Sequence, residues 1–340
     1  EAIDTAIKFA WYYNNGRGLR DKKKIISRLR GYHGVTVAGG SLTAIPLMQN
    51  DFDLPLDRMK QTDTPNFYRF GEAEESEEAF STRLANSLEQ LILQEGPETV
   101  AAFVAEPVMG AGGVILPPAT YFQKIQVVLD KYDILLVADE VICGFGRTGN
   151  MWGCNTYDIR PDMVTCAKQL SSGYLPISAV MISEKIYDVF KEQSRKHGAF
   201  GMGYTYGGHP VSCAVALETL KIYEERDMIG HVQSVAPHFL ERLSELSDSS
   251  IVGEARGVGL IAALELVSDK SSRAQFSPDA KAAPAIAASA LARGLVVRAL
   301  PGDVIGICPP LIIENTQVDE LFDKLAAAVT ETEALLRKAA

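Results

Sequence analysis

The fold is decided by two runs within residues 134–168. They read Ile134-Leu135-Leu136-Val137-Ala138-Asp139-Glu140 and Asp162-Met163-Val164-Thr165-Cys166-Ala167-Lys168. Each is a short apolar run that ends on charged side chains, as is typical of a strand buried on both faces. An open α/β sheet binds ligands just beyond the carboxyl ends of its strands. We therefore expect Asp139 and Lys168 to face one crevice.

A carboxylate and an amine in one crevice are the groups that pyridoxal phosphate chemistry needs. The amine of Lys168 would form a Schiff base with the cofactor aldehyde, and later move a proton between the substrate Cα and the cofactor C4′ carbon. The Asp139 carboxylate would keep the pyridine nitrogen protonated. Spacing alone favours a simpler interpretation, in which Asp139 is a helix cap or turn residue and Lys168 is a surface charge.

A longer segment removes that ambiguity. It reads Ala138-Asp139-Glu140-Val141-Ile142-Cys143-Gly144-Phe145-Gly146-Arg147-Thr148-Gly149 and is followed by the run that ends at Lys168. This sequence closely resembles the class III aminotransferases, from Glu1 to at least Leu311. It is most similar to the omega-amino acid and amine:pyruvate branch, including pyruvate-dependent 4-aminobutyrate transaminases. The resemblance implies pyridoxal 5'-phosphate as cofactor and the PLP-dependent transferase fold type I.

Composition narrows the classes of protein that remain. The 340 residues suffice for two domains, and 47% of them are hydrophobic, as in globular proteins. The net charge of −10 argues against a nucleic-acid partner. No apolar run is long enough to cross a bilayer. Five scattered cysteines without CxxC pairs indicate reduced thiols in the cytoplasm, and five dispersed histidines indicate no metal site.

Apolar runs alternate with helical patterns along the first two thirds of the chain. This alternation predicts a mostly parallel sheet sandwiched by helices. We expect strands at residues 24–29, 100–105, 134–139, 163–167 and 177–183 and near Phe200, and a loop over 44–69. The basic cluster over residues 17–30 is expected to be a solvated surface. We place a large cofactor-binding domain at 1–229 and a smaller α/β domain at 230–340, with strands at 257–265, 296–299 and 304–308.

The resemblance assigns further cofactor contacts. Tyr32 would cover one face of the pyridine ring and Val141 the other, although a turn tyrosine is the alternative for Tyr32. We add Glu106 to the cofactor-binding candidates because it follows the strand 100–105 and precedes a glycine-rich turn. His33 has little claim to a role. We also expect Glu140 and Arg147 to pair with each other.

Two features concern the phosphate and the assembly. In the family a Gly-Ser before the first helix helps to bind the cofactor phosphate. Here the chain starts at Glu1, without an initiator Met, so we expect an N-terminal part to be missing. The resemblance implies that Thr205 binds the phosphate of the neighbouring subunit in a homodimer with shared active sites. A helix-capping or turn hydroxyl is the alternative for Thr205.

Two positions bear on the substrate. The resemblance identifies Arg298 as the arginine that binds the carboxylate of pyruvate or alanine; a surface salt bridge is the alternative. Family members that use 2-oxoglutarate carry a Glu that pairs with this arginine, and here that position is Ala111. The sequence therefore favours an omega-transaminase that moves an amino group from an omega-amino acid or amine to pyruvate. An aminomutase or decarboxylase on the same scaffold, or a catalytically silent binding or structural subunit, remain alternatives.

Overall fold

The computed structural model describes residues 1–339, so residue 340 of the expected second domain lies outside the described residues. The chain divides into two compact units. The first comprises Glu1–Met109, Pro117–Phe145 and Trp152–Arg226, and the second Gly110–Leu116, Gly146–Met151 and Asp227–Ala340. The expected boundary at 229/230 therefore lies just inside the second unit. This unit also takes up two short segments that the sequence placed in the first domain.

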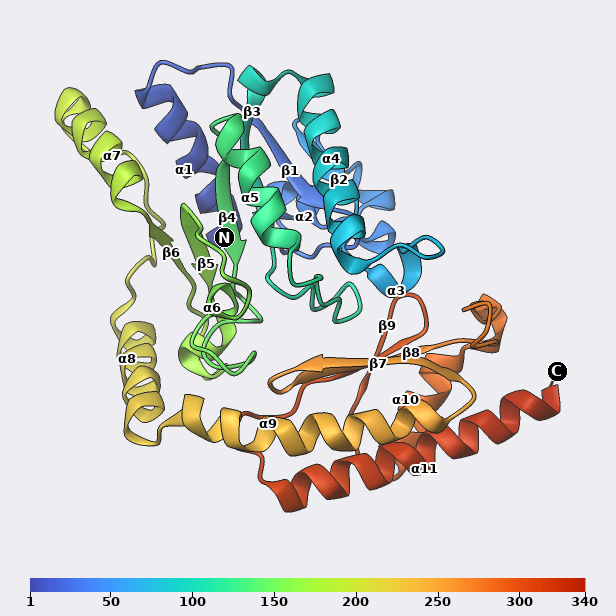
Figure 1. Cartoon of the computed structure of the whole chain (residues 1–340). Coiled ribbons are helices and arrows are strands. Elements are labelled where there is room, and N and C mark those ends of the chain that lie inside the picture. The colour runs from blue at the N-terminus through green and yellow to red at the C-terminus, as the bar shows by residue number, and fades with distance from the viewer. Residues whose placement is uncertain (340) are drawn as a thin grey trace. The chain divides into compact units, whose positions relative to one another are not determined.

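A six-stranded sheet forms the centre of the first unit, in the order β2-β1-β3-β4-β5-β6 (Figure 1). All neighbouring strands are parallel except β5 and β6, which are antiparallel. The strands are β1 (Lys24–Arg28), β2 (Met59–Thr62), β3 (Val100–Ala105), β4 (Leu135–Asp139), β5 (Met163–Cys166) and β6 (Ala179–Ile182). The expectation of a mostly parallel sheet is confirmed.

Helices cover both faces of this sheet, which explains why its strands are continuous apolar runs. Successive residues of a strand point to opposite faces. Leu136 and Ala138 pack with α4 (Glu77–Glu95) and α5 (Tyr121–Lys131). Leu135 and Val137 pack on the other face with α1 (Ala2–Gly16), α2 (Val37–Leu42) and α7 (Glu184–His197). The remaining helices of the unit are α3 (Phe67–Phe70), α6 (Gly153–Tyr157) and α8 (Pro210–Glu225).

The strand order reverses between β1 and β3. From β1 the chain moves outward to β2 at the sheet edge, and then crosses back to β3 on the other side of β1. Open α/β sheets bind ligands at such a switch point, beyond the carboxyl ends of the strands. The segments that follow β1, β3, β4 and β5 all leave the sheet at the carboxyl ends of these parallel strands. The first residues of these segments are therefore candidates for a shared site.

Two expectations for the first unit were wrong. Residues 59–62, expected within a loop, form β2, whose polar sequence Met-Lys-Gln-Thr gives no apolar run because it lies at the edge of the sheet. The segment near Phe200 forms no strand. The Phe200 ring instead stacks on Phe190 and contacts Phe9 and Tyr12, so its apolar character serves a cluster of rings.

The basic cluster is also less solvated than expected. Lys22 is buried. Its amine donates to the backbone carbonyls of Tyr132 and Asp133, at 3.0 and 2.6 Å, beyond the end of α5, and these hydrogen bonds compensate for the burial of its charge. Arg28 is fully buried inside β1. Its guanidinium lies over the rings of Tyr121 and Phe122.

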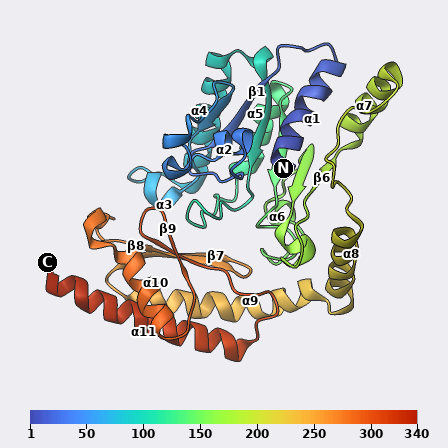
Figure 2. The same cartoon turned by 180° about the vertical axis from the view of Figure 1, so that it is seen from behind.

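The second unit contains an antiparallel sheet with the order β7-β8-β10-β9. Its strands are β7 (Val252–Val258), β8 (Ile261–Leu266), β9 (Arg298–Leu300) and β10 (Val304–Ile307), and its helices are α9 (Met228–Glu245), α10 (Ala282–Ala292) and α11 (Asn315–Ala339). The three helices lie on one side of the sheet (Figure 2). The expected single strand 257–265 is a hairpin, because Gly259 has a φ of +56° and turns the chain. A Cβ at Gly259 would lie 2.5 Å from the Arg147 carbonyl oxygen. Within residues 1–339, no helix is long and apolar enough to cross a membrane.

Candidate active site

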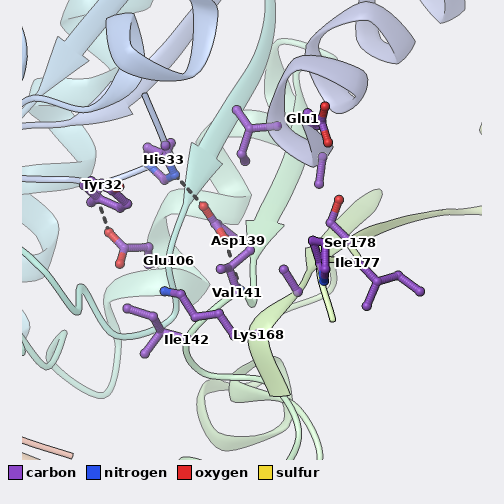
Figure 3. Close-up of a pocket in the computed structure, with 15 residues that line it drawn as sticks. Glu1, Tyr32, His33, Glu106, Asp139, Val141, Ile142, Lys168, Ile177 and Ser178 are labelled. Atoms are coloured by element: carbon purple, nitrogen blue, oxygen red, sulfur yellow. Dashed lines mark hydrogen bonds and ion pairs between the residues drawn. The ribbon is translucent and has the colours of Figure 1, made fainter. Parts of the chain in front are cut away.

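A cavity of about 370 Å³ lies at the switch point of the first unit. Its volume is in the usual range for a small-molecule site. The segments that follow β1, β3, β4 and β5 all contribute to its lining, together with the first turn of α1 (Figure 3). Among its lining residues are Tyr32, Glu106, Asp139, Val141 and Lys168. The structure therefore brings together five of the seven expected site residues.

Asp139 is the last residue of β4, and its carboxylate is held at both oxygens. Oδ1 accepts a hydrogen bond from the backbone N–H of Val141 at 3.1 Å, and Oδ2 lies 2.8 Å from Nδ1 of His33. Asp139 is only 3% exposed. Because a buried carboxylate needs partners, these two contacts fix its orientation at the cavity wall.

His33 was missed by the sequence analysis. Its ring is buried and its Nε2 has no hydrogen-bond partner within the described part of the chain. With Nδ1 donating to Asp139, the ring would be in a defined neutral tautomer or carry a positive charge beside the carboxylate. The signal that could have identified His33 is its place just beyond β1, at the same sheet edge as Asp139.

Lys168 follows β5 and starts a short 3-10 turn, with a φ of +45° that side chains rarely adopt. Such left-handed conformations outside glycine are uncommon and cluster at functional sites. Lys168 is solvent-exposed, and no described residue forms a hydrogen bond or ion pair with its amine. The amine is therefore available to a ligand in the cavity.

Tyr32 and Glu106 are joined across the switch point. The backbone N–H of Tyr32 donates to Oε1 of Glu106 at 3.1 Å. Nη2 of the buried Arg28 donates to the carbonyl oxygen of Glu106 at 2.5 Å. Glu106 thus receives hydrogen bonds at its side chain and its backbone, and these bonds hold the Tyr32 segment against the end of β3.

The expected pair of Glu140 and Arg147 is wrong. The fully buried Glu140 carboxylate accepts from the backbone N–H groups of Gly153 and Cys154, at 2.9 and 2.7 Å, where α6 begins. Burial raises the pKa of this carboxyl. Arg147 belongs to the second unit, where Nη1 donates to the carbonyls of Leu260 and Pro309. Both charged side chains thus bind backbone groups instead of each other.

Thr205 does not line the first cavity. It lies with Met202, Tyr204 and Ser178 in the wall of a second cavity of about 580 Å³. The two cavities share Glu1, Ala2 and residues 176–178 in their linings. Thr205 is exposed, and no described residue hydrogen-bonds to its hydroxyl.

Arg298 and Ala111 both belong to the second unit. Arg298 is the first residue of β9, pairs with Gly306 of β10 through the backbone and is exposed. None of the described residues forms a salt bridge with Arg298, so the alternative of a surface salt bridge has no support. Ala111 lies in the segment Gly110–Leu116. Arg256 holds that segment, since its guanidinium donates to the carbonyls of Gly113 and Val114.

The side chains that line the first cavity suit a bound pyridine ring that carries an aldehyde. An amine without a protein partner, a carboxylate fixed in orientation, an aromatic ring and a branched aliphatic side chain surround one space. The amine suits an aldehyde, the carboxylate suits a protonated ring nitrogen, and the apolar side chains suit the faces of a flat ring.

Comparison with known proteins agrees with this geometry. Residues 1–329 match the family model for class-III aminotransferases, and the chain belongs to this family. It is 54% identical over 333 residues to the chloroplastic gamma aminobutyrate transaminase 3 of Solanum lycopersicum. It is 53% identical to a probable mitochondrial gamma-aminobutyrate transaminase 3 of Oryza sativa. These matches cover 98% of this chain but only 64% and 65% of the two relatives.

Solved structures show the same fold. A transaminase with L-alanine superposes with a TM-score of 0.96 at 53% identity, over 99% of this chain and 79% of that one. The omega transaminase from Pseudomonas jessenii in complex with PMP superposes with a TM-score of 0.96 at 49% identity, over 98% and 74% of the two chains. The expected PLP-dependent transferase fold type I is confirmed.

Proposed function

We propose that the protein is an aminotransferase that uses pyridoxal 5'-phosphate to move an amino group from an omega-amino acid or amine to pyruvate. The observation that carries this proposal is the free amine of Lys168 in the same cavity as the doubly anchored carboxylate of Asp139. Membership of the class-III aminotransferase family supports it.

The cofactor, when bound, supplies an aldehyde that reacts with amines and a protonated ring that withdraws electrons. Lys168 would hold the aldehyde carbon, and its amine would later carry a proton between the two reacting carbons. Asp139 would keep the proton on the ring nitrogen. His33 and the Val141 N–H would keep the Asp139 carboxylate turned toward that nitrogen, while Tyr32 and Val141 would exclude water from the ring faces.

Glu106 would act on the site through its neighbour. Its carboxylate accepts a hydrogen bond from the backbone N–H of Tyr32 and would keep the aromatic ring of Tyr32 over the cofactor. Glu106 also lines the cavity, so we retain it as a cofactor-binding residue. A carboxylate at this position would repel the carboxylate of a substrate placed close to it.

The amino donor we propose is an omega-amino acid such as 4-aminobutyrate, because several relatives are named gamma-aminobutyrate transaminases. Pyruvate is proposed as acceptor on the identity of two side chains. Arg298 offers a bidentate site for a carboxylate. Ala111 supplies no carboxylate to neutralise it.

We further propose a homodimer in which Thr205 binds the phosphate held by the other subunit. Its exposed hydroxyl, in a cavity that lacks a described partner for it, supports this role. The cytoplasmic location stays a prediction, and the relatives are named chloroplastic or mitochondrial.

The experiment that tests the function is an assay of the full-length protein with an amine and pyruvate. A transaminase forms alanine in equal amount to the amine consumed. An aminomutase or decarboxylase would consume the amino compound without forming alanine, and a silent subunit would consume neither. An absorbance band of the bound cofactor that disappears when an amine is added gives a second, independent readout.

A further inference from the structure

The first turn of α1 is tied to the start of α2 by one carboxylate. Oδ1 of Asp4 accepts a hydrogen bond from the hydroxyl of Thr36 at 2.6 Å and from the backbone N–H of Gly39 at 3.1 Å. Thr36 is the N-cap of α2, and its own hydroxyl oxygen also accepts from Gly39. Asp4 therefore completes the cap of a helix that is remote from it in sequence.

The two elements joined in this way carry two walls of the candidate active site. Glu1, Ala2 and Ile3 line the cavity just before Asp4, while Tyr32 and Gly34 line it just before Thr36. Figure 3 shows Glu1 and Tyr32 on different sides of the cavity. The contact between Asp4 and Thr36 therefore bridges the two walls behind the cavity lining.

The charge of Asp4 suits this bridge. A carboxylate in the first turn of a helix is stabilised by the helix dipole, and here it faces the N-terminus of α2 as well as its own helix. A hydrogen bond to an ionised acceptor is also stronger than one between neutral groups. The bridge thus resists separation of the two walls more than a neutral contact would.

We propose that Asp4 is a positioning residue that fixes the spacing of the two walls and thereby sets the affinity of the cavity for pyridoxal 5'-phosphate. This inference rests on the proposed function. Asp4 does not itself line the cavity, so it acts through the first turn of α1 and the Tyr32–Gly34 segment.

The test compares cofactor affinity with the stability of the cofactor-free protein. The full-length protein is stripped of cofactor, and the dissociation constant for pyridoxal 5'-phosphate is measured by absorbance after equilibrium dialysis. Asp4→Ala should weaken binding by about tenfold or more, since small misplacement of binding groups is costly. Asp4→Asn keeps an acceptor oxygen but loses the charge, so it should recover only part of the affinity. Glu184→Ala is the matched control, because Glu184 is an exposed acid in the first turn of α7.

Thr36→Val should also weaken binding, and the double variant Asp4→Ala/Thr36→Val should lose less affinity than the sum of the two single losses, because both variants remove the contact between Asp4 and Thr36. The melting temperature of the cofactor-free Asp4→Ala variant should stay close to that of Glu184→Ala. Unchanged affinity in Asp4→Ala, or losses that add in the double variant, would overturn the proposal. If Asp4→Ala does not fold, the dissociation constant of Thr36→Val for the cofactor tests the proposal instead, and an unchanged value would overturn it. Failure of the wild type to bind the cofactor would instead refute the proposed function.

Discussion

Nδ1 of His33 lies 2.8 Å from Oδ2 of Asp139, and this contact joins the segments that follow β1 and β4. The second oxygen of Asp139 accepts from the backbone N–H of Val141. A carboxylate held at both ends cannot rotate freely, so its remaining lone pairs point in fixed directions. This is the arrangement expected of a group that must keep a proton on a bound ring.

Asp139→Asn should retain the cofactor but lower turnover by at least about a hundredfold, equivalent to roughly 2.7 kcal/mol. The physical reason is that a neutral amide cannot stabilise a positive charge on the ring nitrogen. Single-turnover rates with an excess of amine measure the effect. Asp57→Asn, at an exposed position, is the control. A near-normal rate in Asp139→Asn would show that Asp139 is structural.

His33→Phe should reduce the rate by about tenfold, the value of one hydrogen bond to a charged group. The Phe side chain fills the buried space but leaves Oδ2 of Asp139 without its donor. The pH dependence of the bound cofactor's absorbance should change together with the rate, whereas a purely structural role would alter only the melting temperature. His33→Gln, which keeps an amide donor, should recover part of the rate.

The sequence predicted which residues beyond the strand ends meet at one cavity, because parallel strands have their carboxyl ends at the same side of the sheet. Asp139, Lys168, Tyr32 and Glu106 were found by that rule and by the resemblance. His33 satisfies the same rule, but it was overlooked because a single histidine in a turn carries no spacing pattern. Its role depends on a contact with Asp139, which is 106 residues away along the chain.

Helices and strands with a clear pattern of apolar residues were predicted from the sequence. Elements that lack such a pattern were not predicted. The edge strand β2 has a polar sequence, and the aromatic residues near Phe200 pack against other rings rather than in the sheet. The hairpin of β7 and β8 was taken for one strand because only the positive φ of Gly259 separates them. Burial of Lys22 and Arg28 could not be predicted, since it depends on carbonyls and rings supplied by α5 and the turn that follows it.

The protein should sediment as a dimer, because Thr205 is proposed to serve the neighbouring site. Thr205→Ala should weaken cofactor binding without altering the sedimentation coefficient, since one exposed hydroxyl contributes little to subunit association. Thr82→Ala is the control, because Thr82 is exposed and its hydroxyl donates to the Glu78 carbonyl within α4. A fully active monomer would refute the shared site.

The value of kcat/KM for pyruvate should exceed that for 2-oxoglutarate by at least about a hundredfold, which corresponds to roughly 2.7 kcal/mol in activation free energy. Arg298 is proposed to form a bidentate ion pair with the single carboxylate of pyruvate, whereas the second carboxylate of 2-oxoglutarate would require another cation. Arg298→Ala should depress turnover with pyruvate and spare the half-reaction of an amine without a carboxylate. Arg293→Ala, which removes an arginine paired with Glu331, is the control. Equal use of both keto acids by the wild type would contradict this choice of acceptor.

Mass spectrometry after borohydride reduction of the loaded protein identifies the lysine that holds the cofactor. Reduction makes the bond between lysine and cofactor permanent, so digestion locates it. Lys185 forms an ion pair with Asp162, at the opposite end of β5 from Lys168, and is not expected to react. We expect the added cofactor mass on the peptide that contains Lys168, its loss in Lys168→Ala and its persistence in Lys185→Ala. A cofactor adduct on Lys185, or an unchanged adduct in Lys168→Ala, would contradict the assignment of Lys168.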